Sequence, residues 1–166
     1  YVNDAIEFAS YYIAAKADKL YGKALAEDAV GRSAVAQQYL NQTIDMLLNV
    51  DKLLASHPLY RLEEWVNFAR NSGTTPAEKD AYEINAKRLI TTWGGFQEDY
   101  AARFWSGLIK DYYIPRLKIY FSKQRGSLDN WEEWINTPWI NTTVPFDNPL
   151  DMAVELVQEV KEIRTE

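Results

Sequence analysis

The chain has 166 residues, of which 47% are hydrophobic and 25% are charged, a balance that predicts one globular domain rather than a disordered or collagen-like chain. The net charge of -6 offers no cationic surface for nucleic acid, and the absence of cysteine excludes disulfides, zinc thiolate sites and a cysteine nucleophile. No apolar run approaches the roughly 20 residues of a membrane-spanning helix. The chain opens in an amphipathic pattern without Met, so we expect a piece of a longer polypeptide.

Two long helices are predicted at the N-terminal end. One helical stripe is formed by Ile6, Ala9, Ile13 and Leu20, and a second by Leu40, Ile44, Leu47 and Leu54. The first predicts a helix over residues 3–25. The second predicts a helix that follows Gly31 and stops near Pro58, because a proline disfavours a helical residue before it. We expect the two helices to form an antiparallel hairpin.

The middle of the chain carries a strong helix-start signal. After a short amphipathic helix predicted over residues 59–71, Thr75, Pro76 and Glu78 combine a hydroxyl cap, a proline at the first position and a carboxylate that reaches back. The helix they open would end in a left-handed residue at Gly94 or Gly95. Its apolar face is predicted to consist of Tyr82, Ala86, Leu89 and Trp93.

A further helix is predicted from the four-residue spacing of Tyr100, Phe104, Leu108 and Tyr112. Pro115 removes the amide that would bond back to Asp111, so we expect a kink or a break there. Leu117, Tyr120 and Phe121 continue the pattern until Arg125 and Gly126.

The C-terminal part predicts a short helix capped by Ser127, with Trp131, Trp134 and Ile135 on one face. Residues 136–148 hold two prolines, and we expect an ordered loop pinned by Trp139 and Phe146. A last helix starts at Asn148 and Pro149, and its stripe is Met152, Leu156, Val160 and Ile163. Since no segment alternates with period two and no repeat is visible, the prediction is an all-α, single helical-bundle domain over residues 1–166 with about six or seven helices.

Residues for metal or acid-base chemistry are scarce. His57, the one histidine, precedes a proline and has no second ligand at helical spacing, so we interpret it as structural. Adjacent carboxylates such as Glu63 and Glu64 diverge by about 100° on a helix and cannot flank one bond. No phosphate-binding loop or nucleophile motif is present. We therefore expect no metal, no cofactor and no catalytic residue within this chain.

Aromatic residues make up 14% of the chain, and many are beside amides and carboxylates. An aromatic ring can stack on the apolar face of a sugar, while amides and carboxylates bond its hydroxyls. Most aromatics at helical spacing are core residues. Trp93 and Tyr100 are better candidates for substrate binding, because they bracket the turn at residues 94–99, and connecting loops often carry function.

Several stretches between Trp65 and Arg116 resemble one family. They are residues 81–88 (AYEINAKR), 92–94 (TWG), 99–101 (DYA), 107–108 (GL) and 112–116 (YYIPR). Together with the spacing of Trp65, Tyr82 and Trp93, they are similar to the C-terminal helical domain of alpha-N-acetylglucosaminidases, glycoside hydrolase family 89. A compatible helical pattern extends over nearly the whole chain.

The resemblance implies a longer, exo-acting retaining enzyme that removes terminal α-linked N-acetylglucosamine outside the cytoplasm. Its catalytic carboxylates would belong to a barrel domain of the same polypeptide, ahead of Tyr1. This helical domain would then pack beside the barrel and line one side of the pocket, with Trp93 and Tyr100 at the sugar. The alternative is a stand-alone helical module that binds carbohydrate or protein, which the aromatic content and the acidic charge alone would support.

Overall fold

The computed structural model describes residues 1–93, 103–122 and 129–163, and within them it contains seven α-helices and no strand, which confirms the all-α prediction. The chain divides into two compact units: unit 1 is Tyr1–His57 with Thr143–Glu166, and unit 2 is Pro58–Thr142. Unit 2 is thus inserted between the second helix and the last helix of unit 1. None of the described helices is both long and apolar enough to cross a membrane.

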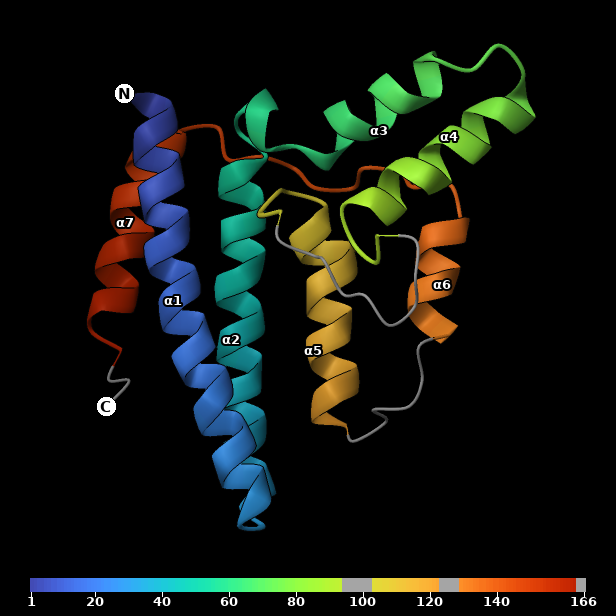
Figure 1. The fold of residues 1–166 in the computed structure, drawn as a ribbon. Helices are drawn as coiled ribbons and strands as arrows, with labels where there is room; N and C mark the ends of the chain where they lie inside the picture. Colours follow the sequence, from blue (N-terminus) through green and yellow to red (C-terminus); the bar gives the residue numbers. More distant parts are fainter. Residues whose placement is uncertain (94–102, 123–128, 164–166) are drawn as a thin grey trace. The chain divides into compact units, whose positions relative to one another are not determined.

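Unit 1 consists of α1 (Val2–Ala29), α2 (Ser33–Leu54) and α7 (Pro149–Lys161), which lie side by side in blue, teal and red (Figure 1). The predicted antiparallel hairpin of α1 and α2 is confirmed. Its turn contains Gly31 in the left-handed region, with φ +81°. α1 continues to Ala29 rather than stopping at Leu25, because residues 26–29 are mostly good helix formers and the first left-handed residue comes only at Gly31.

Aliphatic side chains fill the interior of unit 1. The fully buried members include Ile6, Ile13, Leu20, Val50, Leu53 and Leu54. One carboxylate is buried among them: Asp51 accepts a hydrogen bond of 2.7 Å from the hydroxyl of Thr143. At the far end of α7, the Lys16 ammonium donates to the carbonyl of Ile163 at 3.2 Å. These two bonds fix α7 and the residues before it to the hairpin.

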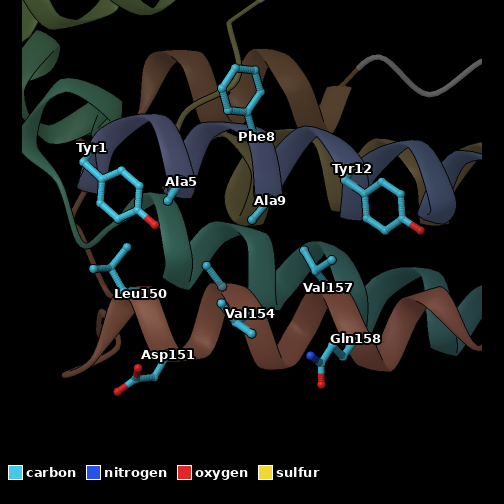
Figure 2. Close-up of a pocket in the computed structure, with 11 residues that line it drawn as sticks. Tyr1, Ala5, Phe8, Ala9, Tyr12, Leu150, Asp151, Val154, Val157 and Gln158 are labelled. Atoms are coloured by element: carbon cyan, nitrogen blue, oxygen red, sulfur yellow. The ribbon is translucent and has the colours of Figure 1, made fainter.

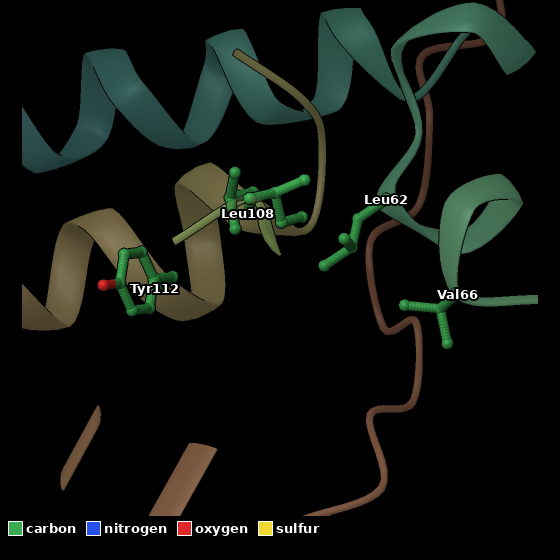
Figure 3. Close-up of a cluster of buried hydrophobic side chains, with 5 residues drawn as sticks. Leu62, Val66, Leu108 and Tyr112 are labelled. Atoms are coloured by element: carbon green, nitrogen blue, oxygen red, sulfur yellow. The ribbon is translucent and has the colours of Figure 1, made fainter. Parts of the chain in front are cut away.

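Unit 2 contains α3 (Leu62–Asn71), α4 (Pro76–Leu89), α5 (Ile114–Phe121) and α6 (Asp129–Asn136). The predicted start of α4 is confirmed as a complete capping box, in which the Thr75 hydroxyl accepts from the Glu78 amide and the Glu78 carboxylate accepts from the Thr75 amide. Five buried side chains, four of which are labelled in Figure 3, form the apolar core of the unit. They are Leu62, Val66, Ile90, Leu108 and Tyr112.

Two predicted helix boundaries in unit 2 are wrong for the same reason. Residues 59–61 are not α-helical, since Pro58–Tyr60 form a 3-10 turn and Arg61 is extended and bridges to Ser106. The helix predicted from Tyr100 through Tyr112 is absent over residues 103–107. The Ser106 amide instead donates to the Tyr60 carbonyl at 2.8 Å, and its carbonyl accepts from Leu62 at 3.0 Å. Helical spacing within one segment contains no information about such pairing with a distant one.

Pro115 affects the helix before it without breaking it. Residues Ile109–Tyr113 form a π-helix, and α5 follows directly with Pro115 in its first turn. The Ile114 amide donates to the Ile109 carbonyl, five residues back. The predicted disturbance at Asp111 is therefore a local widening of the helix.

Residues 137–147 form the predicted irregular segment, and α7 begins at Pro149 as expected. Trp139 anchors the unit 2 part of this segment through its indole N–H, which donates to the Asp111 carboxylate at 2.8 Å. In unit 1 the Lys52 ammonium lies 5.7 Å from the centre of the Phe146 ring. The predicted cap at Ser127 lies outside the described residues.

Candidate functional site

Trp93 is the one residue other than glycine with a positive φ among the described residues. It follows the C-terminal end of α4 and adopts φ +56°, and its amide donates to the Arg88 carbonyl at 2.7 Å. A residue with a side chain pays about 1–3 kcal/mol for such a conformation, and strained residues of this kind cluster at functional sites. The indole is 54% exposed. The left-handed position that the sequence suggested for Gly94 or Gly95 is thus occupied by Trp93, and the two glycines lie outside the described residues.

The turn that carries Trp93 is firmly anchored on its N-terminal side. Thr91 is fully buried, and its hydroxyl donates to the Lys87 carbonyl at 2.7 Å. Ile90 belongs to the apolar core of unit 2. The backbone is therefore held by buried groups up to two residues before the exposed indole, which limits the orientations that Trp93 can take.

A polar cluster lies at the same end of α4. The Arg88 guanidinium is 3.4 Å from the Glu132 carboxylate and 3.4 Å from the Asn136 amide oxygen, and the Asn136 amide donates to Glu132 at 3.2 Å. The Nε of Arg88 is buried and has no partner among the described residues. Guanidinium, carboxylate and amide groups together can both donate to and accept from sugar hydroxyls. No local sequence pattern predicts this cluster, because α4 and α6 are far apart in the chain.

The buried face of α4 differs from the predicted one. Of the four residues assigned to its apolar face only Ala86 is buried, whereas Tyr82, Leu89 and Trp93 are exposed by 44%, 39% and 54%. The buried stripe instead includes Glu83 and Lys87, which are 1% and 0% exposed. An i, i+4 Glu-Lys pair is typical of a solvated helix face. Residue type alone therefore predicted that the opposite side of α4 is buried.

Glu83 and Lys87 are the centre of a buried network that holds four segments together. One Glu83 oxygen is 3.1 Å from the Lys87 ammonium and accepts from the Trp139 amide at 2.5 Å, while the other accepts from Arg70 at 2.6 Å. The Lys87 ammonium donates to the Trp134 carbonyl at 3.0 Å and to the Thr137 carbonyl at 2.5 Å. Burial lowers the pKa of Lys87, and the hydrogen bond to Glu83 opposes that change.

Most of the other tryptophans in unit 2 have structural contacts. The Trp65 indole N–H donates to the Ala86 carbonyl at 2.9 Å, and its ring lies 6.2 Å from that of Trp105. Trp134 lies 5.2 Å from the Tyr112 ring. Trp139 packs against Gly107, where φ is +87° and a Cβ would lie 2.5 Å from the indole. Trp93, more than half exposed and in a strained backbone, differs from these core and packing residues.

Three further sequence predictions concern Tyr100, metal binding and His57. Tyr100 lies outside the described residues, so its pairing with Trp93 stays a prediction. Within residues 1–93, 103–122 and 129–163, no group of three or more His, Asp or Glu side chains could hold a metal ion. His57 lies in the turn after α2, where its amide donates to the Leu54 carbonyl at 3.2 Å.

Comparisons with known proteins point to one family. The family model "Alpha-N-acetylglucosaminidase (NAGLU) C-terminal domain" matches residues 1–161. Alpha-N-acetylglucosaminidase of Homo sapiens is 36% identical over 78 residues, which make up 46% of this chain and 10% of that protein.

Solved structures of a family 89 glycoside hydrolase from Clostridium perfringens share the fold. The complex with 2-acetamido-1,2-dideoxynojirmycin has a TM-score of 0.80 and 22% identity, over 96% of this chain and 21% of that one. The complex with its substrate GlcNAc-alpha-1,4-galactose also has a TM-score of 0.80 and 22% identity, over 95% and 21%. The chain thus spans about a fifth of the length of these solved relatives. Since the family model matches nearly all of its residues, the chain belongs to the family of alpha-N-acetylglucosaminidase C-terminal domains.

Proposed function

We propose that this chain is the C-terminal helical part of an exo-acting, retaining alpha-N-acetylglucosaminidase, and that it lines one side of the substrate pocket. The observation that carries the proposal is Trp93, whose side chain is exposed and whose backbone is left-handed, just after the end of α4. The family to which the chain belongs supports a role in sugar binding. The natural substrate class would be glycans that end in α-linked N-acetylglucosamine. A solved relative binds GlcNAc-alpha-1,4-galactose, which supports this choice.

The proposed role of this chain is binding and orientation. An indole face offers a flat apolar surface for the C–H groups of a pyranose, and the nearby Arg88, Glu132 and Asn136 side chains could bond its hydroxyls. Retaining hydrolysis needs two carboxyl groups about 5–5.5 Å apart, one as acid/base and one as nucleophile. We assign both to a barrel domain of the same polypeptide. Binding energy from Trp93 and Tyr100 would then orient the sugar for those groups.

The proposal also implies a location and a set of partners. The partners are the catalytic barrel of the same polypeptide and a terminal α-linked N-acetylglucosamine. An enzyme that trims such glycans would act outside the cytoplasm, in a lysosome, a periplasm or the medium. Nucleic acid is not a proposed partner, because the net charge of -6 would repel phosphates.

Substitution of Trp93 in the complete enzyme tests the proposed binding role. We expect Trp93→Ala to lower kcat/KM by more than tenfold, or about 1.4 kcal/mol of transition-state stabilisation. Trp93→Gly should lower kcat/KM as strongly, while removal of the left-handed strain keeps the melting temperature at or above that of the unsubstituted enzyme. The measurements are steady-state kinetics on an aryl α-N-acetylglucosaminide and thermal unfolding of the same samples.

A matched control uses an exposed aromatic on α4, the helix that Trp93 follows. Tyr82 is 44% exposed, and Tyr82→Ala should leave kcat/KM within about twofold. Near-normal turnover of both Trp93 variants would contradict the binding role. A large loss of stability in Trp93→Gly with activity lost in proportion would instead show that Trp93 only supports the fold.

A further inference from the structure

An apolar groove of about 500 Å³ runs between α1 and α7 in unit 1 (Figure 2). Leu150, Val154 and Val157 rise from α7 toward α1, where the facing positions are Ala5 and Ala9. The groove exists because these two α1 positions carry only a methyl group. Tyr1 and Tyr12 mark its two ends.

Large apolar side chains along this groove are exposed to water. Val154 is 60% exposed, and Phe8, which also lines the groove, is 75% exposed. Isolated exposed apolar residues are normal, but a contiguous apolar hollow on a soluble unit is typical of an interaction surface. The groove therefore has the properties of a surface that a partner covers.

The two helix segments that form the groove carry acidic side chains. Residues 1–15 and 148–160, which form the relevant parts of α1 and α7, contain no Lys or Arg. Their charged side chains are all carboxylates: Asp151 lines the groove, and Asp4, Glu7, Glu155 and Glu159 belong to the same two helices. An apolar groove between two acidic helix segments is complementary to an apolar segment flanked by basic residues.

We propose that the groove binds an apolar segment flanked by Lys or Arg, which belongs to the part of the same polypeptide that precedes Tyr1. This inference rests on the proposed function, in which the chain is the C-terminal part of a longer enzyme, and on the finding that it spans only 21% of the solved relatives. In such an enzyme the preceding residues leave from the end of the groove that Tyr1 marks. A tethered segment also reaches the groove at high effective concentration.

A second copy of the chain is a poorer occupant than a basic segment. If two copies met across this groove, each would bring the same acidic helix segments against the other. Like charges close together across an interface cost several kcal/mol, so the sign of the charge disfavours a symmetric contact.

The experiment measures access to Val154 in the full-length gene product. The matched residue is Val30, which is also an exposed valine of unit 1, at 64% against 60% for Val154. Val154→Cys and Val30→Cys are made separately, labelled with a maleimide in the native state, and followed by mass spectrometry of the labelled peptide. We expect Val154→Cys to react at least tenfold more slowly than Val30→Cys, and the two rates to converge in urea. Equal native rates would overturn the inference.

Two further measurements test which partner covers the groove. The protection should be independent of protein concentration; protection that appears only as the protein dimerises would assign the groove to a second copy and overturn the inference. In the Val154→Cys background, Asp151→Lys with Glu155→Lys should raise the ratio of the native labelling rate to the rate in urea at least threefold, because each variant serves as its own reference for the reactivity of the thiol. An unchanged ratio would overturn the basic character of the partner.

The outcome for the groove can be separated from that for the proposed function. Labelling reports on the groove, whereas the Trp93 variants report on substrate binding. A protected Val154 in a polypeptide whose hydrolysis of N-acetylglucosaminides does not depend on Trp93 would support the groove and contradict the pocket role. An accessible Val154 in an enzyme whose activity depends on Trp93 would contradict the groove inference and support the pocket role.

Discussion

Unit 1 buries aliphatic side chains along three helices, whereas unit 2 buries an ion pair and packs several tryptophans against a smaller apolar cluster. In unit 1 the contacts lie on helical stripes, and the helices stabilise one another through non-directional packing. In unit 2 directed hydrogen bonds join several segments in addition to the apolar core, such as those from the Trp139 amide to Glu83 and from Lys87 to backbone carbonyls. Two parts of one chain can therefore be stabilised in different ways, one mainly by non-directional packing and the other also by directed hydrogen bonds.

The largest expected effect comes from removing one half of the buried pair. Glu83→Leu leaves the Lys87 ammonium and the Trp139 amide without their carboxylate partner, and breaking a buried pair in this way costs about 3–5 kcal/mol. We expect native-state hydrogen exchange to show the loss in α4 amides, with α1 and α2 amides much less affected. The double variant Glu83→Leu with Lys87→Met should recover at least about 1 kcal/mol, because no charge is then left unpaired. A single-variant loss below about 1 kcal/mol would contradict the network's importance.

The next effect compares two left-handed glycines, one in each unit. Gly31 has φ +81° with nothing within 4 Å of a Cβ, whereas at Gly107, with φ +87°, a Cβ would lie 2.5 Å from Trp139. Gly31→Ala should cost only the conformational term of about 1–2 kcal/mol. Gly107→Ala should cost about 1–3 kcal/mol more, because the indole must also move. Urea unfolding of both variants measures the difference in the free energy of unfolding. Equal losses in the two variants would show that the Trp139 indole moves away from a Cβ at no measurable cost.

The smallest effect concerns the capping box that starts α4. Thr75→Ala removes the acceptor of the Glu78 amide and should destabilise the chain by about 1 kcal/mol in urea unfolding. Thr75→Ser keeps the hydroxyl and is the control. Its loss should be a few tenths of a kcal/mol. A Thr75→Ala loss no larger than that of Thr75→Ser would mean that tertiary packing alone fixes the start of α4.

The sequence predicts unit 1 better than unit 2, for a physical reason. Stripes such as Ile6, Ile13 and Leu20 report on helix packing directly, and the hairpin and the last helix follow from them. In unit 2 the buried face of α4 is marked by Glu83 and Lys87, whose burial depends on partners far along the chain. The bridge between Arg61 and Ser106 is equally long-range, so local spacing predicted a helix where the chain is extended.

The candidate site was predictable only in part. Trp93 was a candidate because it borders the turn at residues 94–99 and lies in a family-like motif, and it is exposed in the structure. The sequence predicts the left-handed conformation at Gly94 or Gly95, because residues other than glycine rarely adopt it, whereas the structure has it at Trp93. Arg88, Glu132 and Asn136 come together through the packing of α4 on α6, which no local pattern shows.

The insertion of unit 2 within unit 1 has a consequence for synthesis on the ribosome. The hairpin of α1 and α2 emerges first, but α7, which packs on both, follows only after all of Pro58–Thr142. At about 5–20 residues per second, the hairpin waits several seconds with the face for α7 uncovered. A nascent chain of this design is therefore exposed to chaperones and to wrong partners for longer than one whose core helices are consecutive.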